Sequence, residues 1–315
     1  MHPLKTYLQT YYRDYFVHHR QLLWQPVLFC VLLVVAEYGW GYEQFFPKAQ
    51  SPLGLRWLVD WLYVLLVWGG SLWLVRKSLT KKPDRRDWLL LLIGAGIYAM
   101  RSVYQGHFDW LQANGLEWSR QTFYAAWYTA GQIMQMLLVV PPLLILHLWL
   151  KSRGEAGFAG LKRTPIGGYL WLLMGAVPLV VLAATQSAFT TYYPFFARIF
   201  PPEYPAFQQS ADVWRIAFFE LFYALDFFST ELFFRGFLVL AFVRWLGPAA
   251  ILPMAVFYVT IHFGKPLGET ISSFFGGYLL GIFAYYSRSI WGGVLVHIGL
   301  AWLMELAGGL VRFVW

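Results

Sequence analysis

The chain has 315 residues, of which 59% are hydrophobic, 20% are aromatic and only 13% are charged. About a quarter of the residues of a soluble globular protein are usually charged, so this composition excludes a soluble fold. The formal net charge of +8 does not indicate nucleic-acid binding, because the basic residues lie in short connectors between apolar blocks. The single cysteine, Cys30, excludes both a disulfide framework and a cysteine-based metal site.

Nine apolar blocks of membrane-crossing length follow one another along the chain. A helix needs roughly 20 apolar residues to cross a hydrocarbon core of about 30 Å. The blocks lie at 23–42, 55–75, 88–105, 124–150, 165–186, 212–245, 248–263, 268–286 and 289–312. The sequence therefore predicts an all-α, polytopic transmembrane bundle of about nine spans, with a range of eight to ten.

Lys and Arg are concentrated in alternate connectors. The richest segments are 1–22, 76–86 and 151–163. Because positively charged connectors stay in the cytoplasm, all three are expected on that side. The chain is thus predicted to be an integral, multi-pass protein of the plasma or inner membrane, with a cytoplasmic N-terminus and membrane lipid as a partner.

The block at 212–245 is longer than one crossing requires. As one helix it would run about 51 Å, which exceeds one bilayer core. If it breaks into two spans, every later helix changes sides.

The distribution of polar residues divides the chain into three parts. Residues 1–186 hold five helices with only isolated polar residues, and we expect them to be accessory. Residues 187–211 are rich in aromatic residues and proline, notably at 192–194 and 201–202, and are expected to form an external loop at the membrane interface. Residues 212–315 are predicted to be the functional core.

Ionisable residues gather in the helices of this last part. Such groups cost several kcal/mol in hydrocarbon unless they pair or line a wet cavity, so they predict a shared polar interior. They are Arg215, Glu220, Asp226, Glu231, Arg235, His262, His297 and Glu305.

Four of these residues indicate a site for chemistry. Glu231 and Arg235 are four residues apart, which predicts an ion pair on one helix face. His262 ends its apolar block, and His297 follows the small pair Gly292-Gly293. A carboxylate with two histidines suits either a carboxylate base with imidazoles that stabilise an oxyanion, or a metal site, and the residues alone leave both open.

The order and spacing of these residues resemble the CPBP family of intramembrane proteases, which includes the type II CAAX prenyl proteases. The family is marked by Glu-Glu-x-x-x-Arg, an aromatic residue four before a histidine, and a later histidine commonly followed four residues on by asparagine. Glu231 and Arg235 match the second glutamate and the arginine. Tyr258 and His262 match the aromatic-histidine element, and His297 matches the last histidine.

The resemblance implies an intramembrane endopeptidase that hydrolyses a peptide bond near the membrane surface with a carboxylate-activated water. It implies a peptide or membrane-protein substrate, no nucleic-acid partner and no cofactor; a zinc site is the less favoured alternative.

Two expected catalytic positions depart from the family pattern. Thr230 stands where the family has its first glutamate, and Ala301 stands where asparagine is common. Asp226 lies one turn before Thr230 on the same helix face, and Glu305 lies one turn beyond Ala301, so either carboxylate is a candidate substitute.

The resulting hypothesis makes Asp226 or Glu231 the base, with His262 and His297 as oxyanion and proton partners. Arg235, Thr230, Tyr258 and Glu305 are the supporting residues. The departures also favour an alternative, a catalytically silent family member that acts as a membrane scaffold or immunity protein. Intramembrane ionisable residues also mark proton-coupled transporters, but the two halves of the chain show no inverted repeat.

Overall fold

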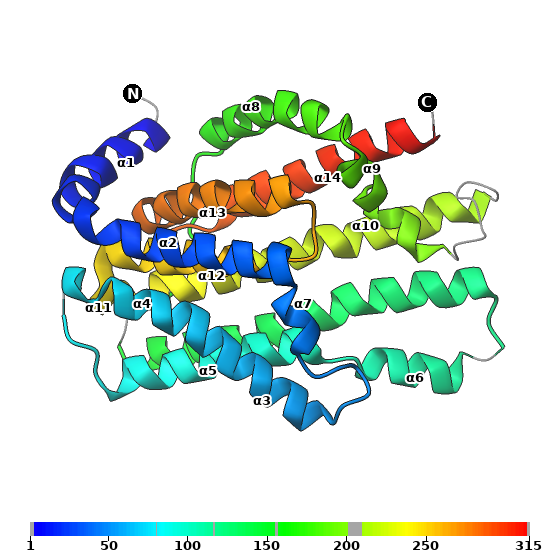
Figure 1. Cartoon of the computed structure of the whole chain (residues 1–315), viewed down its shortest axis with the longest axis horizontal. Coiled ribbons are helices and arrows are strands. Elements are labelled where there is room, and N and C mark those ends of the chain that lie inside the picture. The colour runs from blue at the N-terminus through cyan, green and yellow to red at the C-terminus, as the bar shows by residue number, and fades with distance from the viewer. Residues whose placement is uncertain (1–2, 80, 116, 155–156, 201–209, 314–315) are drawn as a thin grey trace.

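The computed structural model describes residues 3–79, 81–115, 117–154, 157–200 and 210–313, and these residues are mainly helical (Figure 1). The only strand-like contact among them is an isolated bridge between Leu161 and Ser289. The α-helices are α1 (Pro3–Tyr11), α2 (Val17–Trp40), α3 (Leu53–Val64), α4 (Gly70–Leu74), α5 (Arg85–Val103), α6 (Gly106–Asn114), α7 (Arg120–Ser152), α8 (Gly167–Ala184), α9 (Ser187–Tyr192), α10 (Ser210–Glu231), α11 (Val243–Leu246), α12 (Ile251–Thr260), α13 (Leu267–Ser287) and α14 (Trp291–Phe313).

Seven stretches of the described residues are long and apolar enough to cross a membrane. They are Pro3–Trp40, Leu53–Leu74, Arg120–Ser152, Gly167–Ala184, Val243–Thr260, Leu267–Ser287 and Trp291–Arg312. The other two predicted spans, 88–105 and 212–245, are also helical as α5 and α10, but they carry more charged residues. The prediction of an all-α polytopic bundle is therefore confirmed, with seven of the nine predicted spans meeting the length and composition criteria.

Residues 210–241 form one continuous helix. α10 passes directly into a π-helical segment, η6 (Leu232–Ala241), and Glu231 at the junction has helical backbone angles (φ −67°, ψ −38°). The predicted block at 212–245 therefore does not break into two spans. It ends at Ala241 rather than at residue 245, because Val243 begins the next helical stretch.

The Lys- and Arg-rich connectors share one end of the molecule, at the left of Figure 1. Two hydrogen bonds to backbone carbonyls link segments at this end. The Lys81 amide donates to the Trp245 carbonyl at 3.2 Å, and the Ser289 hydroxyl donates to the Lys162 carbonyl at 2.6 Å. This common end is the arrangement that the charge pattern predicts for segments on one side of a membrane.

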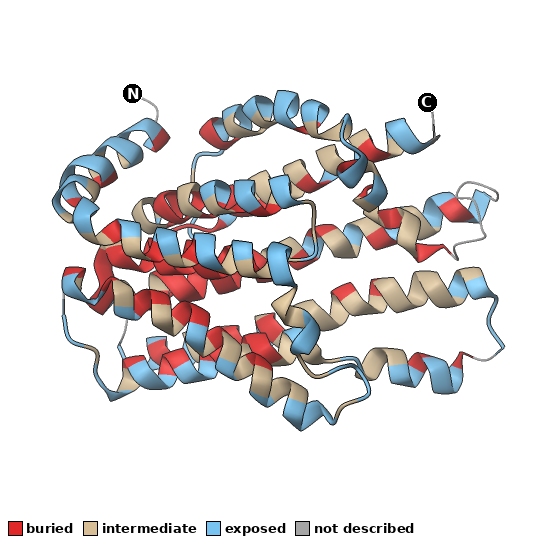
Figure 2. Cartoon of the chain, in the orientation of Figure 1, coloured by how far each residue is buried: buried red, intermediate tan, exposed pale blue. Residues whose placement is uncertain are grey.

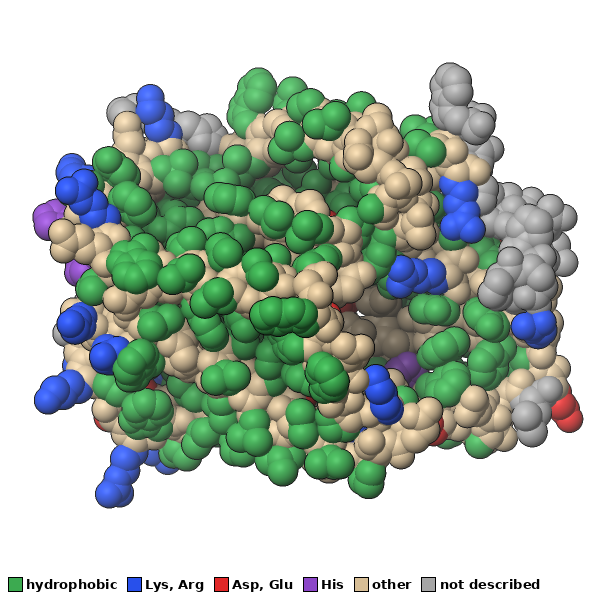
Figure 3. All heavy atoms as spheres, in the orientation of Figure 1, with side chains coloured by type: hydrophobic (Ala, Val, Ile, Leu, Met, Phe, Trp, Pro, Cys, Tyr) green, Lys and Arg blue, Asp and Glu red, His purple; other side chains and the backbone are tan. Residues whose placement is uncertain are grey.

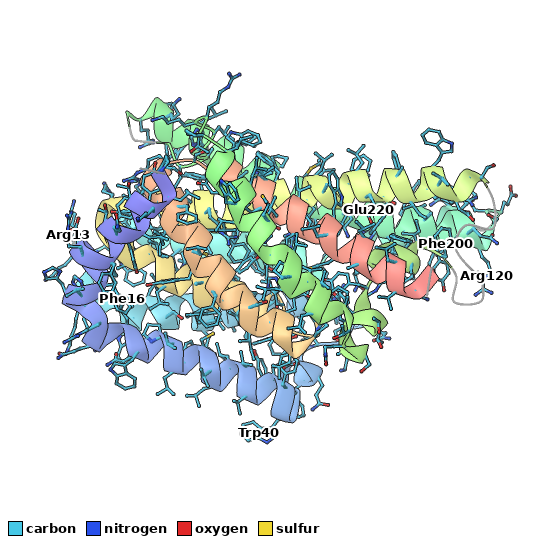
Figure 4. The ribbon with its side chains drawn as sticks, turned by 90° about the horizontal axis from the view of Figure 1, so that it is seen from above. Arg13, Phe16, Trp40, Arg120, Phe200 and Glu220 are labelled. Carbon is cyan, nitrogen blue, oxygen red and sulfur yellow. The ribbon has the colours of Figure 1, made fainter. Side chains whose placement is uncertain are left out.

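The two ends are also clear in the view from above. Figure 4 shows Arg13 and Phe16 at one end of the long axis, and Arg120 and Phe200 at the other. The turn that follows α12 and contains His262 leads into α13 at the end away from the basic connectors (Figure 1).

The centre of the bundle is α12. All ten of its residues are buried, and burial is densest around it (Figure 2). A helix that is apolar all round is expected inside a protein rather than at its surface. α12 packs against α13 and α2, so a helix of the N-terminal part lies directly against the functional core.

The aromatic segment after α8 is partly ordered into short helices. α9 and a 3-10 turn, η5 (Phe195–Ile199), lie between α8 and α10. The Pro201-Pro202 element of the predicted external loop lies outside the described residues. The division into accessory and core parts, and the external position of this loop, stay predictions.

Candidate active site

The Glu231–Arg235 ion pair is at the centre of the candidate site. The Arg235 Nη1 atom lies 2.9 Å from Glu231 Oε1, and both side chains are fully buried. The predicted pairing at i and i+4 is thus confirmed. The pair straddles the junction of α10 with the π-helical η6, and such π segments are frequent at functional sites.

His297 approaches Glu231 from α14. Its Nδ1 atom lies 2.7 Å from Glu231 Oε1, and Nδ1 is the donor because a carboxylate oxygen accepts. The Phe227 ring stacks on the imidazole with ring centroids 5.2 Å apart. Gly293 permits the close approach of α14, because a Cβ atom there would collide with Glu231 Oε2.

Tyr258 of α12 completes the chain of contacts. Its hydroxyl is hydrogen-bonded to His297 Nε2, and it donates that bond in the neutral tautomer that has its proton on Nδ1. The Arg235 guanidinium carbon also lies 4.5 Å from the centroid of the Tyr258 ring. Side chains of three separate helical stretches therefore meet here.

His262 is attached to the same tyrosine. Its Nδ1 atom lies 2.9 Å from the backbone carbonyl of Tyr258, which can only accept, so Nδ1 carries a hydrogen. In neutral His262 the Nε2 atom is then the proton acceptor. The Thr270 hydroxyl fixes the turn by donating to the His262 carbonyl at 2.8 Å.

The centre of the site has unused hydrogen-bonding capacity. Among the described residues, Glu231 Oε2 and the three guanidinium nitrogens of Arg235 are buried and make no hydrogen bond of good geometry. The contact between these two residues is therefore a charge pair rather than a directional hydrogen bond. Buried polar atoms of this kind are uncommon and mark places where a small polar molecule fits.

Asp226 has other partners. Its two carboxylate oxygens accept from Arg101 of α5 at 2.8 Å and from the Ser229 hydroxyl at 2.6 Å. None of its described contacts is with His262 or His297. Arg101 was not predicted as the partner of Asp226, although a lone arginine in a predicted span indicates a buried partner.

Glu305 also lies in another network. Its carboxylate accepts from the backbone N–H groups of Phe195 and Phe196 at 2.8 and 3.0 Å, so it caps the turn that follows α9. Thr230 and Ala301 are both buried. Glu305 thus contacts the aromatic loop, the segment predicted at 187–211, rather than the residues of the candidate site that it was predicted to support.

A second ion pair near His262 was not predicted. Lys265 Nζ lies 2.7 Å from Glu269 Oε1, and the Tyr193 hydroxyl donates to both oxygens of Glu269 at 3.0 and 2.9 Å. Burial and the neighbouring Glu269 raise the pKa of Tyr193 well above its usual range, so Tyr193 stays a donor at physiological pH. These contacts join the aromatic loop to the start of α13.

One face of the molecule is hollowed. Figure 3 shows the hollow to the right of centre, with Lys and Arg side chains at its rim. Among the described residues, no group of three or more His, Cys, Asp or Glu side chains is arranged to hold a metal ion. Chemistry without a metal stays a prediction.

Residues 212–303 match the family model described as type II CAAX prenyl endopeptidase Rce1-like. Through this segment, the chain is similar to the type II CAAX prenyl endopeptidases. The matched segment contains Glu231, Arg235, Tyr258, His262 and His297. No curated protein and no solved structure matches the chain. This match and the seven apolar stretches together indicate an integral membrane protein.

Proposed function

We propose that the chain is an intramembrane endopeptidase that hydrolyses a peptide bond near the membrane surface. The observation that carries the proposal is the continuous chain of contacts Arg235–Glu231–His297–Tyr258, with His262 held on the Tyr258 carbonyl. It supplies a proton acceptor, a hydrogen-bond donor and a fixed carboxylate, which are the groups that hydrolysis of an amide needs.

The roles follow from the hydrogen bonds. His262 Nε2 accepts a proton from the water as the water oxygen bonds to the peptide carbonyl carbon. The Tyr258 O–H donates to the carbonyl oxygen as negative charge develops there, which rotation about its C–O bond permits. His262 then gives its proton to the leaving amine as the C–N bond breaks, so no proton is lost or gained.

In this scheme Glu231 orients His297 and does not itself activate the water. It fixes the tautomer of His297, and Arg235 holds Glu231 in place. Asp226 is less suited to be the base, because both of its oxygens are engaged by Arg101 and Ser229. In this scheme the Tyr258 hydroxyl serves as the oxyanion donor. The family commonly has an asparagine for that role, and this chain has Ala301 at its position.

The experiment compares newly formed protein N-termini, by mass spectrometry, in membranes from cells that produce the wild-type chain or a variant. His262→Gln and Tyr258→Phe are the test variants, and His107→Gln on α6 is the matched control. All variants are first checked for wild-type amount and thermal midpoint.

We expect a set of cleavages that the control retains, and that falls at least about a hundredfold in the His262 variant because general base catalysis is lost.

A second function, a catalytically silent scaffold that binds a peptide in the same place, is favoured by Thr230 and Ala301. Identical N-termini in all samples, together with retained peptide cross-linking at the site, would support the scaffold and reject the protease.

A further inference from the structure

A separate groove lies on the outer surface between α2 and α4. Its volume is about 500 Å³, within the range of small-molecule sites. Most of its lining is apolar or aromatic, including Leu22, Leu28, Phe29 and Leu32 of α2 and Trp73 and Leu74 of α4. No residue of the candidate active site contributes to it.

Two positive charges close one end of this groove. Arg76 and Lys77 belong to the short turn η4 (Arg76–Ser78) after α4 and are exposed. The Arg76 guanidinium stacks on Trp73, 3.7 Å from the ring centroid, and donates to the Trp73 carbonyl at 2.8 Å. Among the described residues, neither Arg76 nor Lys77 forms an ion pair with a carboxylate.

The length of the groove matches one leaflet of a bilayer. Its α2 lining runs from Leu22 to Leu32, which is about 15 Å at 1.5 Å per helical residue. That is half of a hydrocarbon core of about 30 Å. Trp24 and Trp73 lie near the charged end, and tryptophan is enriched at the level of lipid headgroups.

The charged end of the groove belongs to the Lys- and Arg-rich end of the molecule. Figure 3 shows Lys and Arg side chains gathered at the left end, beside a surface that is mainly hydrophobic. An occupant must therefore combine an apolar tail about one leaflet long with a negative charge at the membrane surface.

We propose that this groove binds one anionic phospholipid of the leaflet at the Lys- and Arg-rich end. Its phosphate group contacts Arg76 and Lys77, and an acyl chain lies along Leu28, Phe29 and Leu32. A zwitterionic lipid is disfavoured, because its own headgroup cation would lie beside two uncompensated positive charges.

The test titrates the purified full-length protein in detergent with phosphatidylglycerol or phosphatidylcholine and counts bound lipid by native mass spectrometry. The test variant is Arg76→Gln/Lys77→Gln. The matched control, Lys81→Gln/Lys82→Gln, removes the same charge from the same connector at exposed positions outside the groove. Leu32→Trp fills the apolar end without changing the charge.

We expect wild type and the control to bind one phosphatidylglycerol with preference over phosphatidylcholine. The Arg76/Lys77 variant should bind phosphatidylglycerol about tenfold more weakly or worse, and Leu32→Trp should also weaken it. Equal losses in the test and control doubles would show general attraction by the basic connector and overturn the proposal. So would binding that none of the variants changes, or dimer formation in place of lipid binding. The measurement involves no proteolysis, so its result does not depend on the proposed function.

Discussion

At the residue scale, the site depends on a buried ion pair, in which each charge is compensated by the other rather than by solvent. Glu231 and Arg235 have no exposed side-chain surface, so removal of one leaves the other buried and uncompensated. Arg235→Gln should lower the free energy of unfolding by about 3–5 kcal/mol, measured by denaturant titration in mixed micelles. Arg13→Gln, which removes a solvent-exposed pair with Asp14, should leave the free energy of unfolding nearly unchanged. A loss at Arg235 no larger than that at Arg13 would contradict the buried pairing.

Two glycines provide a matched test of the close packing against Glu231. A Cβ atom at Gly293 would collide with the Glu231 carboxylate, whereas nothing lies within 4 Å of one at Gly276 in α13. Gly293→Ala should therefore lower the thermal midpoint. Gly276→Ala should leave the midpoint unchanged or raise it, because alanine in place of a helical glycine stabilises the helix by up to about 1 kcal/mol. A tolerated Gly293→Ala would mean that α14 does not approach Glu231 this closely.

Residue spacing predicted the local part of the site but not its long-range partners. Four residues along one helix were enough to predict the Glu231–Arg235 pair, because that contact depends only on helix geometry. Asp226 binds Arg101, which is 125 residues away, and Glu305 binds backbone groups about 110 residues away. Spacing along a single helix cannot predict these partners, because they come together only when the helices pack.

At the element scale, the aromatic loop is held by two acidic side chains of different helices. Tyr193 binds Glu269 of α13, and Glu305 of α14 caps the turn at Phe195 and Phe196. Glu305→Leu should remove both backbone bonds and speed hydrogen exchange of the loop amides at least about tenfold, because bonds to charged groups contribute about 1.5–3 kcal/mol. Thr191→Ala is the control, since among the described residues that hydroxyl donates only to the Ser187 carbonyl in its own helix. Unchanged exchange in the Glu305 variant would contradict the anchoring role.

The helix boundaries show which features of a helix a hydropathy pattern can predict and which it cannot. The block at 212–245 was predicted as one unit, and its first 30 residues do form one helix. Its change to π-helical turns after Glu231 leaves no mark on composition, so the pattern could not reveal it. The boundary at Ala241 was missed for the same reason, because apolar residues continue on both sides of it.

At the scale of the whole molecule, we predict that α5 and α10 cross the membrane together with the seven more apolar stretches. The helices run between two ends of the molecule, and the basic connectors share one of these ends (Figure 1). Single cysteines introduced after Cys30→Ser, at Lys82 and Asn114 around α5 and at Ala211 and Arg244 around α10, should react with a membrane-impermeant thiol reagent from opposite sides. Labelling of both members of a pair from one side would show that the enclosed helix does not cross.

The proposed site requires that α10 and α14 meet through Glu231 and His297, which are 66 residues apart in the sequence. The most direct measurement is a double-mutant cycle on the free energy of unfolding, with Glu231→Gln, His297→Gln and the double variant. We predict a coupling energy of about 0.5–3 kcal/mol, as expected for residues in contact. Additive losses, with a coupling below about 0.3 kcal/mol, would mean that the two side chains do not share a site.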